Sequence, residues 1–482
     1  MLFNSPLFIF VFLPVAFVGF HLLRRWNWRA AIGLLTLASM LFYVAWNPLQ
    51  AWPIFASIAG NFACGLALKH VRQGRWGGPV LAVGVGANLA ALAYFKYAGF
   101  LAANVGMTMA EVALPLGISF FTFTQIAYLV DVRRGIASEA DFLNYCLFVT
   151  FFPHLIAGPI IHHKEMMPQF QRPSERPLAD DVAAGLALFA IGLMKKVVLA
   201  DAVAGYASPI FAAAQGDPHL PFLAAWQGAL AYTAQIYFDF SGYSDMAVGL
   251  ARMFGINLPV NFNSPYQARN IIEFWRRWHI TLSRFLRDYL YLPLGGNRLG
   301  RRRRYLNLAV VMLIGGLWHG ANWTFVVWGG LHGLYLAINH LWRDWRGEQP
   351  ASPLAQGLGW AITLLAVIVG WVFFRATDMT TALGMLGGMA GLNGFGGVGE
   401  DQLASLPGLG LALALLALAM VAPNSQQMVR DHAPGLHPVA APARFAALVV
   451  RFNGAWAAVL ALATLAAILN LWSPTEFLYY QF

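Results

Sequence analysis

The stretch of residues 305–342 contains no Asp, Glu, Lys or Arg, and it constrains the fold more than any other feature of this chain. Similar apolar runs of about 20 residues recur elsewhere, which is the length that an α-helix needs to cross a bilayer. Charged residues make up 11% of the 482 residues, against about a quarter in water-soluble domains. The alternating pattern of a membrane β-barrel is absent. The sequence therefore predicts an all-α polytopic membrane protein.

Basic residues predict the orientation of the chain, because short loops rich in Lys and Arg remain on the cytoplasmic side. Such residues follow the first, third and fifth apolar runs, at 24–29, 69–75 and 133–134. The loops near 47–52 and 98–107 lack them. We therefore expect the N-terminus outside and the odd-numbered spans ending inside. The first run lacks the basic start and the cleavage site of a signal peptide, and we expect it to remain as a span.

Further spans are expected at 182–199, 222–240, 306–322, 323–341, 358–374, 405–420 and 446–469, for a total of about 12. The segment 142–161 differs, because basic residues flank both of its ends. Pro153 and the Gly158-Pro159 pair interrupt a helix there, which predicts a re-entrant hairpin or two short half-spans. Cys64 and Cys146 lie in or near apolar runs and are expected to be packing residues, not a disulfide framework or a metal site.

Positive charge is concentrated in residues 264–304, which hold ten arginines against Glu273 and Asp288. The whole chain has a formal net charge of +10, so most of the excess lies in this segment. Its sign places the segment on the cytoplasmic side. Two interpretations stay open: a solvated face that binds anionic lipid, or a dock for a phosphate-bearing donor, since the guanidinium fork matches phosphate.

Within this segment, residues 275–290 are predicted to form one amphipathic helix at the membrane interface. Apolar side chains fall on one face, and Arg277, Arg284 and Arg287 fall on the other. His279 lies on the apolar face and is expected to point into the protein or the membrane. Ionisable groups at that depth are costly to bury and are commonly functional. A hydrogen-bonded packing histidine is the alternative.

His319 lies inside the charge-free stretch, 15 residues beyond Arg304. That length of straight helix rises about 22 Å, which places His319 past the midplane of a core about 30 Å thick. Glycines on both sides let another group approach the ring, and Trp318 and Trp323 can form the walls of a pocket. A neutral imidazole there can act as a general base. Helix packing is the alternative, and it is the expected role of His332, which has a similar setting.

Two acidic residues, Asp239 and Asp245, lie near the inner end of the span expected at 222–240. Ser241 and Asp245 are four residues apart and share one face of that helix. Two roles stay open for this pair: a helix boundary, or the orientation of a catalytic group.

Several strings carry a resemblance to a known family: YFDFSGYSDMAVGL at 237–250, FNSPYQARNIIEFWRRWHITLSRFLRDYLYLPLGG at 262–296 and GGLWHGANWTFVVWGGLHG at 315–333. Over essentially its whole length the chain resembles the membrane-bound O-acyltransferase family, in particular the bacterial branch that contains the membrane subunit of alginate O-acetylation. The N-terminal MLFNSPLFIFVFLPV, the segment FFPHLIAGPIIHHKEMMPQF and the C-terminal FLYYQF add to this resemblance.

The resemblance implies a ring-like bundle of tilted spans around a tunnel that crosses a bacterial cytoplasmic membrane. In-plane or re-entrant helices would accompany the spans. A single domain would cover residues 1–482, with N-terminal helices at 1–110, the catalytic core at 111–345 and C-terminal helices at 346–482.

The same resemblance implies that His319, in the WHG motif, is the catalytic histidine and that His279 lines the tunnel with it. An interfacial helix and a residue beyond the midplane lie at different depths, so we expect the tunnel to join them and to pass Gly316. The residues expected to contact the substrates are Trp278, Trp318, Asn322, Asp245, Arg277, Arg284 and Arg287.

The implied reaction moves an acyl group, most simply acetyl, from a cytoplasmic thioester toward an extracytoplasmic polysaccharide. The donor would be acetyl-CoA or an acyl carrier thioester, bound as a substrate, with no permanently bound cofactor and no metal. An extracytoplasmic acetyltransferase would complete the transfer as a partner protein, and no nucleic acid is involved. The alternatives are D-alanyl transfer from a carrier protein to teichoic acid and, in another class, a transporter or flippase, although no internal repeat supports the latter.

Overall fold

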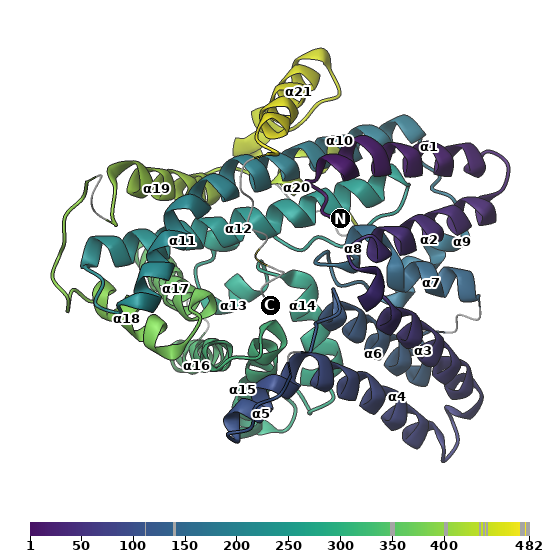
Figure 1. Ribbon diagram of the computed structural model, residues 1–482, viewed down its shortest axis with the longest axis horizontal. Helices are drawn as coiled ribbons and strands as arrows, with labels where there is room; N and C mark the ends of the chain where they lie inside the picture. Colours follow the sequence, from purple (N-terminus) through teal and green to yellow (C-terminus); the bar gives the residue numbers. More distant parts are fainter. Residues whose placement is uncertain are drawn as a thin grey trace.

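The computed structural model describes residues 1–110, 112–137, 141–347, 352–399, 403–432, 435–436, 439, 442–472 and 478. All regular secondary structure in these residues is helical, which confirms the expected all-α class. Figure 1 shows two groups of helices on either side of a central region. One group comes from the N-terminal part of the chain (purple to blue), and the other comes mostly from its second half (green).

The first group begins with helices whose ends are set by polar caps. Asn27 accepts a hydrogen bond from the backbone N–H of Ala30, and Asp141 accepts one from that of Leu143. The elements are the π-helical turn η1 (Phe8–Phe12), α1 (Leu13–Arg24), α2 (Trp28–Val44), α3 (Trp52–Val71), α4 (Gly77–Leu92), the π-helical turn η3 (Ala93–Tyr97), α5 (Ala98–Asn104), α6 (Ile118–Arg134), α7 (Phe142–Thr150), α8 (Phe152–Leu155) and α9 (His163–Gln171).

Two long helical stretches run side by side across the molecule and connect the two groups (Figure 1). The first stretch is continuous through a π-helical turn. It consists of α10 (Leu178–Met194), η4 (Lys195–Ala200) and α11 (Asp201–Gly216), and the second stretch is α12 (Phe222–Met253).

Small residues bring α10 and α12 into backbone contact. A Cβ on Gly185 would lie 2.6 Å from the carbonyl oxygen of Gly249, and one on Gly192 would lie 2.6 Å from that of Gly242. The glycines are seven residues apart on each helix, so the contact repeats along the pair. This close approach is the common way in which helices associate inside a membrane.

Charged side chains at this contact are paired with one another. Lys196 Nζ lies 2.6 Å from a carboxylate oxygen of Asp201 and 2.7 Å from one of Asp239. Arg252 Nε lies 2.9 Å from Asp181. A charge left unpaired at this depth would be strongly destabilising. The pairs therefore fix the register of α12 against the first stretch.

The second group consists mostly of helices that begin at a capping side chain. The caps are Asn322, Ser352, Asp378, Ser405, Asn424 and Asn453. The helices of this group are α15 (Gly300–His319), α16 (Trp323–Arg346), α17 (Pro353–Arg375), α18 (Met379–Met389) and α19 (Leu406–Val421). Two further capped helices, α20 (Ser425–Met428) and α21 (Gly454–Leu469), pack against α10.

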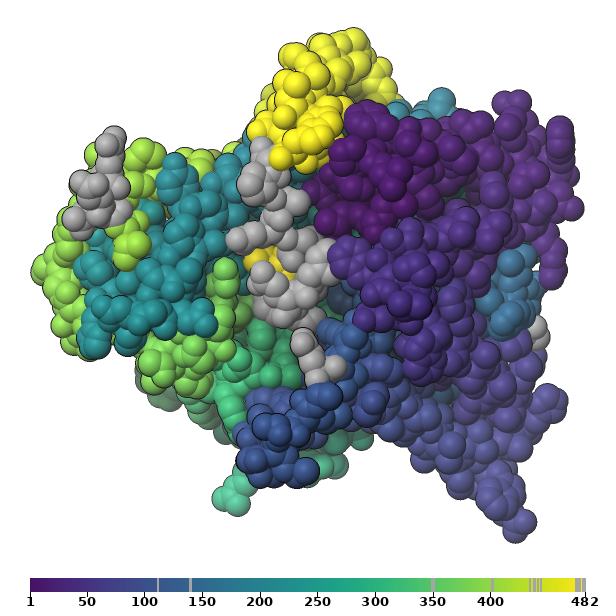
Figure 2. Space-filling model, viewed as in Figure 1, coloured from purple at the N-terminus to yellow at the C-terminus, as the bar shows by residue number. Residues whose placement is uncertain are grey.

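Among the described residues, four helical stretches are long and apolar enough to cross a membrane: Pro48–Val71, Gly77–Asn104, Leu178–Gly216 and Pro353–Arg375. Shorter apolar helices cover Phe8–Arg24, Trp28–Val44, Leu406–Val421 and Gly454–Leu469. The last of these, α21, projects beyond the rest of the surface (yellow in Figures 1 and 2). The expected total of about 12 spans stays a prediction.

The segment 142–161 is broken, as expected. Helix α7 ends at Thr150, α8 is a single turn that starts at Phe152, and the residues after Ile156 are not helical up to His163. This irregular backbone is buried inside the protein, where other groups can satisfy it. The Ile160 N–H, for example, donates to the hydroxyl of Thr281 at 3.0 Å.

The expected single helix over residues 275–290 is wrong. The structure has a short α13 (Ile271–Trp275), a break, then α14 (Ile280–Leu286) and the π-helical turn η6 (Arg287–Tyr291). The break occurs because His279 adopts a left-handed conformation with φ 42°. Backbone hydrogen bonds to residues 261–263 hold it there: Asn263 N–H donates to the Arg277 carbonyl, and Ile280 N–H donates to that of Asn261, both at 2.9 Å. The C-terminal FLYYQF lies outside the described residues except for Leu478.

Candidate active site

The residues around His319 form a tight turn between α15 and α16. Helix α15 ends at His319 because Gly320 adopts an extended conformation, with φ −164° and ψ 151°. Asn322 then begins α16 by accepting a hydrogen bond from the Thr324 N–H at 3.0 Å. The amide of Asn322 also donates to the Thr377 carbonyl at 2.6 Å. The turn therefore presents His319 at the end of a helix whose position is fixed on several sides.

Glycines are needed where α15 and α16 meet. A Cβ on Gly316 would collide with the carbonyl oxygen of Phe325, and a Cβ on Gly320 would collide with the ring of the same residue. A larger residue at either position would push the two helices apart. The expectation that Gly316 borders a channel between the histidines is wrong, because this glycine packs against α16.

The ring of His319 is enclosed by aromatic side chains and also borders a cavity. The residue is 3% exposed, and its ring centre lies 5.2 Å from that of Trp328 and 5.0 Å from that of Phe374. Together with Trp318 and Lys96 it lines a cavity of about 320 Å³. Its Nδ1 has no hydrogen-bond partner among the described residues. Buried polar atoms are usually paired, so this ring is available to a bound molecule.

His279 has a defined tautomer. Its Nδ1 lies 3.1 Å from Oδ1 of Asn261, and the same oxygen accepts from the backbone N–H of Thr281 (3.3 Å) and from its hydroxyl (2.9 Å). A backbone N–H can only donate, so the Asn261 atom is the amide oxygen and His279 Nδ1 carries the proton. The other ring nitrogen, Nε2, therefore has a free lone pair, and it has no partner in the described part of the chain.

The two histidines lie next to each other. Their ring centres are 6.4 Å apart, with the Trp318 ring 4.9 Å from His319 and 6.1 Å from His279. The expectation that they occupy different depths is therefore wrong. The helical break at His279 explains the difference, since the ring is carried inward by the loop instead of lying on an interfacial helix.

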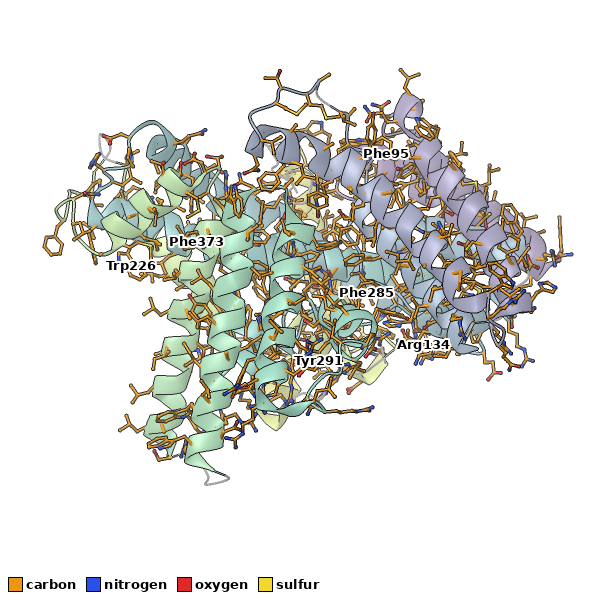
Figure 3. The ribbon with its side chains drawn as sticks, turned by 90° about the horizontal axis from the view of Figure 1, so that it is seen from below. Phe95, Arg134, Trp226, Phe285, Tyr291 and Phe373 are labelled. Atoms are coloured by element: carbon orange, nitrogen blue, oxygen red, sulfur yellow. The ribbon has the colours of Figure 1, made fainter. Side chains whose placement is uncertain are left out.

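The site lies away from the arginine-rich end of the molecule. In Figure 3, Phe95 and Phe373 lie toward one end of the helices, and Arg134 and Tyr291 lie toward the other. Phe95 and Phe374, the next residue after Phe373, line a second cavity of about 610 Å³. The turn that follows His319 lines the same cavity. Phe285 lies between the two ends and stacks on Phe123 with ring centres 4.2 Å apart.

Of the tryptophans expected to contact the substrates, Trp318 lies beside both histidines, whereas Trp278 lines neither cavity. Trp318 lines the smaller cavity, and its indole N–H donates to the Ser119 carbonyl at 3.3 Å. Trp278 is buried against Trp371, with ring centres 4.8 Å apart. Asn322 lines the larger cavity. Trp323, by contrast, is 53% exposed and borders neither cavity.

Asp245 is already engaged by protein groups. Its carboxylate lies 2.7 Å from Lys195 Nζ, accepts from the hydroxyl of Ser425, and lies 3.2 Å from the amide of Gln426. These bonds hold α20 against α12. A role of Asp245 in substrate binding stays a prediction, and its partner Ser241 instead donates to the Tyr237 carbonyl.

The three arginines expected to bind a donor each face a carboxylate. The ion pairs are Arg277 with Glu273 at 2.7 Å, Arg284 with Glu165 at 2.6 Å and Arg287 with Asp288 at 2.7 Å. Further along, Arg298, Arg302 and Arg303 are exposed, and none of them has an ion pair with a described residue. The exposed arginines without an ion pair thus lie near the start of α15, whereas the sequence pattern indicated Arg277, Arg284 and Arg287.

Two residues that are not among those predicted from the sequence contact the histidines: Asn261 contacts the ring of His279, and Lys96 contacts the backbone of the turn at His319. No sequence pattern marks Asn261, because its role depends on a contact with a residue 18 positions away in the sequence. The sequence does mark Lys96, since it is the only Lys or Arg in the apolar stretch 76–132. Within the described residues, no group of three or more His, Cys, Asp or Glu is placed to hold a metal ion.

The chain is similar in sequence to known proteins over most of its length. The pattern of the membrane-bound O-acyltransferase family matches residues 80–377. A peptidoglycan O-acetyltransferase from Helicobacter pylori is 44% identical over 432 residues, which cover 82% of this chain and 80% of the relative. A probable alginate O-acetylase from Pseudomonas putida is 41% identical over 442 residues, or 88% and 87% of the two chains. A teichoic acid D-alanyltransferase from Streptococcus thermophilus is 31% identical over 283 residues, or 54% and 68%.

The fold and the site thus define a class of protein. It is a multi-pass helical membrane protein with two buried histidines side by side, one of which borders a cavity. The chain belongs to the membrane-bound O-acyltransferase family, and it is an acyltransferase. The family assignment also decides against the transporter or flippase alternative.

The tautomer of His279 gives a first prediction. Replacing Asn261→Leu removes the acceptor for Nδ1–H, so that the proton can move to Nε2 and the free lone pair of Nε2 is lost. We expect the acyl-transfer rate to fall by about 10²-fold, the usual contribution of one proton-transferring group. Steady-state kinetics of the purified protein would measure this.

The matched control is Ser244→Ala, which removes only the bond from the Asn261 amide to the Ser244 hydroxyl at 3.3 Å. This variant should stay within a few-fold of the wild type, because the loss of one neutral hydrogen bond has a modest effect. An equal loss in both variants would show that Asn261 acts only through packing.

Proposed function

We propose that this protein transfers an acyl group, most simply acetyl, from a cytoplasmic thioester to a hydroxyl on the outer side of a bacterial cytoplasmic membrane. The single observation that carries the proposal is the pair His319 and His279, with ring centres 6.4 Å apart. His319 borders a cavity of about 320 Å³, and it ends the helix whose first residues carry the exposed arginines. The N-terminus would lie outside, as the basic loops indicate.

In the proposed reaction, His319 is the general base. The imidazole takes the proton of the acceptor hydroxyl as its oxygen attacks the thioester carbonyl carbon. A carbon–oxygen bond forms, the carbon–sulfur bond breaks, and the departing thiolate takes a proton, which leaves His319 neutral again. His279, with a free lone pair at Nε2, lies close enough to share in proton transfer or to orient the substrate.

The donor would bind at the opposite end of the site. Acetyl-CoA and an acyl carrier protein both present phosphate or acidic groups, and the exposed arginines around the start of α15 suit either. Arg301 is 78% exposed, and the Asp344 carboxylate 3.9 Å from it lies closer to Arg304, at 2.8 Å, so that the charge of Arg301 is only partly balanced. The phosphates would remain in water, because their transfer into the hydrocarbon core is prohibitively unfavourable.

The acceptor would be an extracytoplasmic polysaccharide. Relatives that match more than four fifths of this chain are named for peptidoglycan and alginate acetylation, which supports acetyl as the acyl group. An extracytoplasmic acetyltransferase partner would complete the transfer. D-alanyl transfer to teichoic acid is the second candidate, and the weaker match to the D-alanyltransferase makes it less favoured.

The general-base role is tested by His319→Ala. We expect the variant to insert and fold, since a smaller side chain leaves the turn intact, and to lose acyl transfer by roughly 10²–10⁴-fold. Transfer of a labelled acetyl group by the protein in proteoliposomes gives the readout. The matched control is His332→Ala, a buried histidine one helical turn beyond Trp328 that is not part of either cavity. Retention of more than about a tenth of the rate in His319→Ala would contradict the proposal.

The donor site is tested by changing Arg302 and Arg303 together to Gln. We expect a higher KM for the donor and a weaker dependence of kcat/KM on salt, because two exposed charges no longer attract it. The control is Arg287→Gln, an exposed arginine whose charge is already balanced by Asp288. If the double variant keeps its KM and only its binding to anionic vesicles weakens, the arginines serve as a lipid anchor.

A further inference from the structure

The π-helical turn η3 (Ala93–Tyr97) reaches the end of the helix that carries His319. It interrupts the apolar stretch Gly77–Asn104 between α4 and α5. Single π-helical turns inside α-helices are rare and are frequent at functional sites. Here the turn places two consecutive polar side chains, Lys96 and Tyr97, on the face that meets α15.

These two side chains bind the last carbonyls of α15. Lys96 Nζ donates to the carbonyl of Trp318 at 2.6 Å, to that of His319 at 3.1 Å and to the hydroxyl of Ser119 at 3.1 Å. The Tyr97 hydroxyl donates to the Leu317 carbonyl at 2.6 Å. The last four carbonyls of any helix have no partner inside the helix, so they need donors from elsewhere.

A lysine is a costly way to supply such donors inside an apolar span. In the described part of the chain, no carboxylate lies within 4.0 Å of the Lys96 ammonium. Its charge is balanced instead by carbonyl oxygens at the negative end of the α15 dipole. Tyr97 shows that a neutral hydroxyl can perform the purely structural part of this task. The positive charge of Lys96 therefore calls for a further explanation.

Lys96 also borders both cavities beside the catalytic turn. It lines the cavity of about 320 Å³ with His319, and the cavity of about 610 Å³ with Gly320 and Asn322. During acyl transfer, negative charge develops on the thioester carbonyl oxygen close to His319. A fixed positive charge near that oxygen favours the transition state over the ground state.

We propose that Lys96 is a positioning residue for acyl transfer. Its ammonium holds the carbonyls of Trp318 and His319, so that the His319 ring is kept in the cavity and a positive charge faces the reacting atoms. The proposal rests on the proposed role of His319 as the base. In this proposal the π-helical turn η3 serves the reaction, because a regular α-helix would be sufficient to span the membrane.

The test compares Lys96→Met with Tyr97→Phe, since each removes donors to the same end of α15. We expect Lys96→Met to lower kcat by about 10²-fold or more while the donor KM changes little, because the charge acts on the transition state. Tyr97→Phe removes only a neutral bond and should keep kcat within a few-fold. Both variants are checked for yield and thermal stability in detergent.

Chemical restoration makes the test independent of folding. In a background with Cys64→Ala and Cys146→Ala, the variant Lys96→Cys is treated after purification with 2-bromoethylamine, which rebuilds an ammonium at nearly the length of lysine. We expect this treatment to restore at least about a tenth of the background rate, since it returns the charge to the same place. Iodoacetamide, which adds a neutral amide, should not restore it.

The proposal is overturned if Lys96→Met keeps more than half of the wild-type kcat, or if the neutral amide restores Lys96→Cys as well as the ammonium does. Neither result would affect the assignment of His319. Conversely, an active His319→Ala variant would contradict the role of His319 as the base, and the rates of Lys96→Met and Tyr97→Phe could still be compared. The two proposals therefore fail separately.

Discussion

The end of helix α15 is the constraint on which the rest of the site depends. A helix that stops inside an apolar bundle leaves carbonyls that water cannot reach, and each of them needs a donor from the protein. Lys96 and Tyr97 supply those donors, and Gly320 lets the chain leave the helix in an extended conformation. The imidazole of His319 is thereby held at a fixed place, close to the aromatic side chains of Trp318, Trp328 and Phe374.

The same principle governs the charges elsewhere in the bundle. Lys196 is balanced by Asp201 and Asp239, and Arg252 is balanced by Asp181, so that every one of these buried groups has a counter-charge. These pairs join α12 to the neighbouring stretch and create a rigid frame. The loop that carries His279 is attached to this frame through Asn261 and Ser244, which lies on α12. Thus the two histidines meet because two separate supports bring them together.

Much of this arrangement could be predicted from the sequence. The apolar runs gave the all-α membrane class, and the charge-free stretch with its glycines singled out His319. The interruption of 142–161 followed from its prolines and glycine, because these residues act locally. The position of His279 could not be predicted in the same way. Helical periodicity places it on an interfacial face, whereas backbone hydrogen bonds to residues 261–263, remote in the sequence, force it into a left-handed conformation. The pairing of Arg277, Arg284 and Arg287 with carboxylates was equally invisible, since a charge count does not show which charges are neutralised.

The central claim is that the acyl group crosses the membrane while donor and acceptor stay on opposite sides, and sidedness tests it most directly. The protein would be reconstituted in sealed vesicles, and the fraction facing each way would be determined by trypsin access to the exposed Arg302 and Arg303 at the start of α15. Labelled acetyl-CoA would then be supplied only inside or only outside, with a hydroxyl acceptor on the other side. The account predicts transfer when the donor contacts the face that bears Arg298, Arg302 and Arg303, and none in the opposite arrangement. Equal transfer with the donor on either face would contradict it.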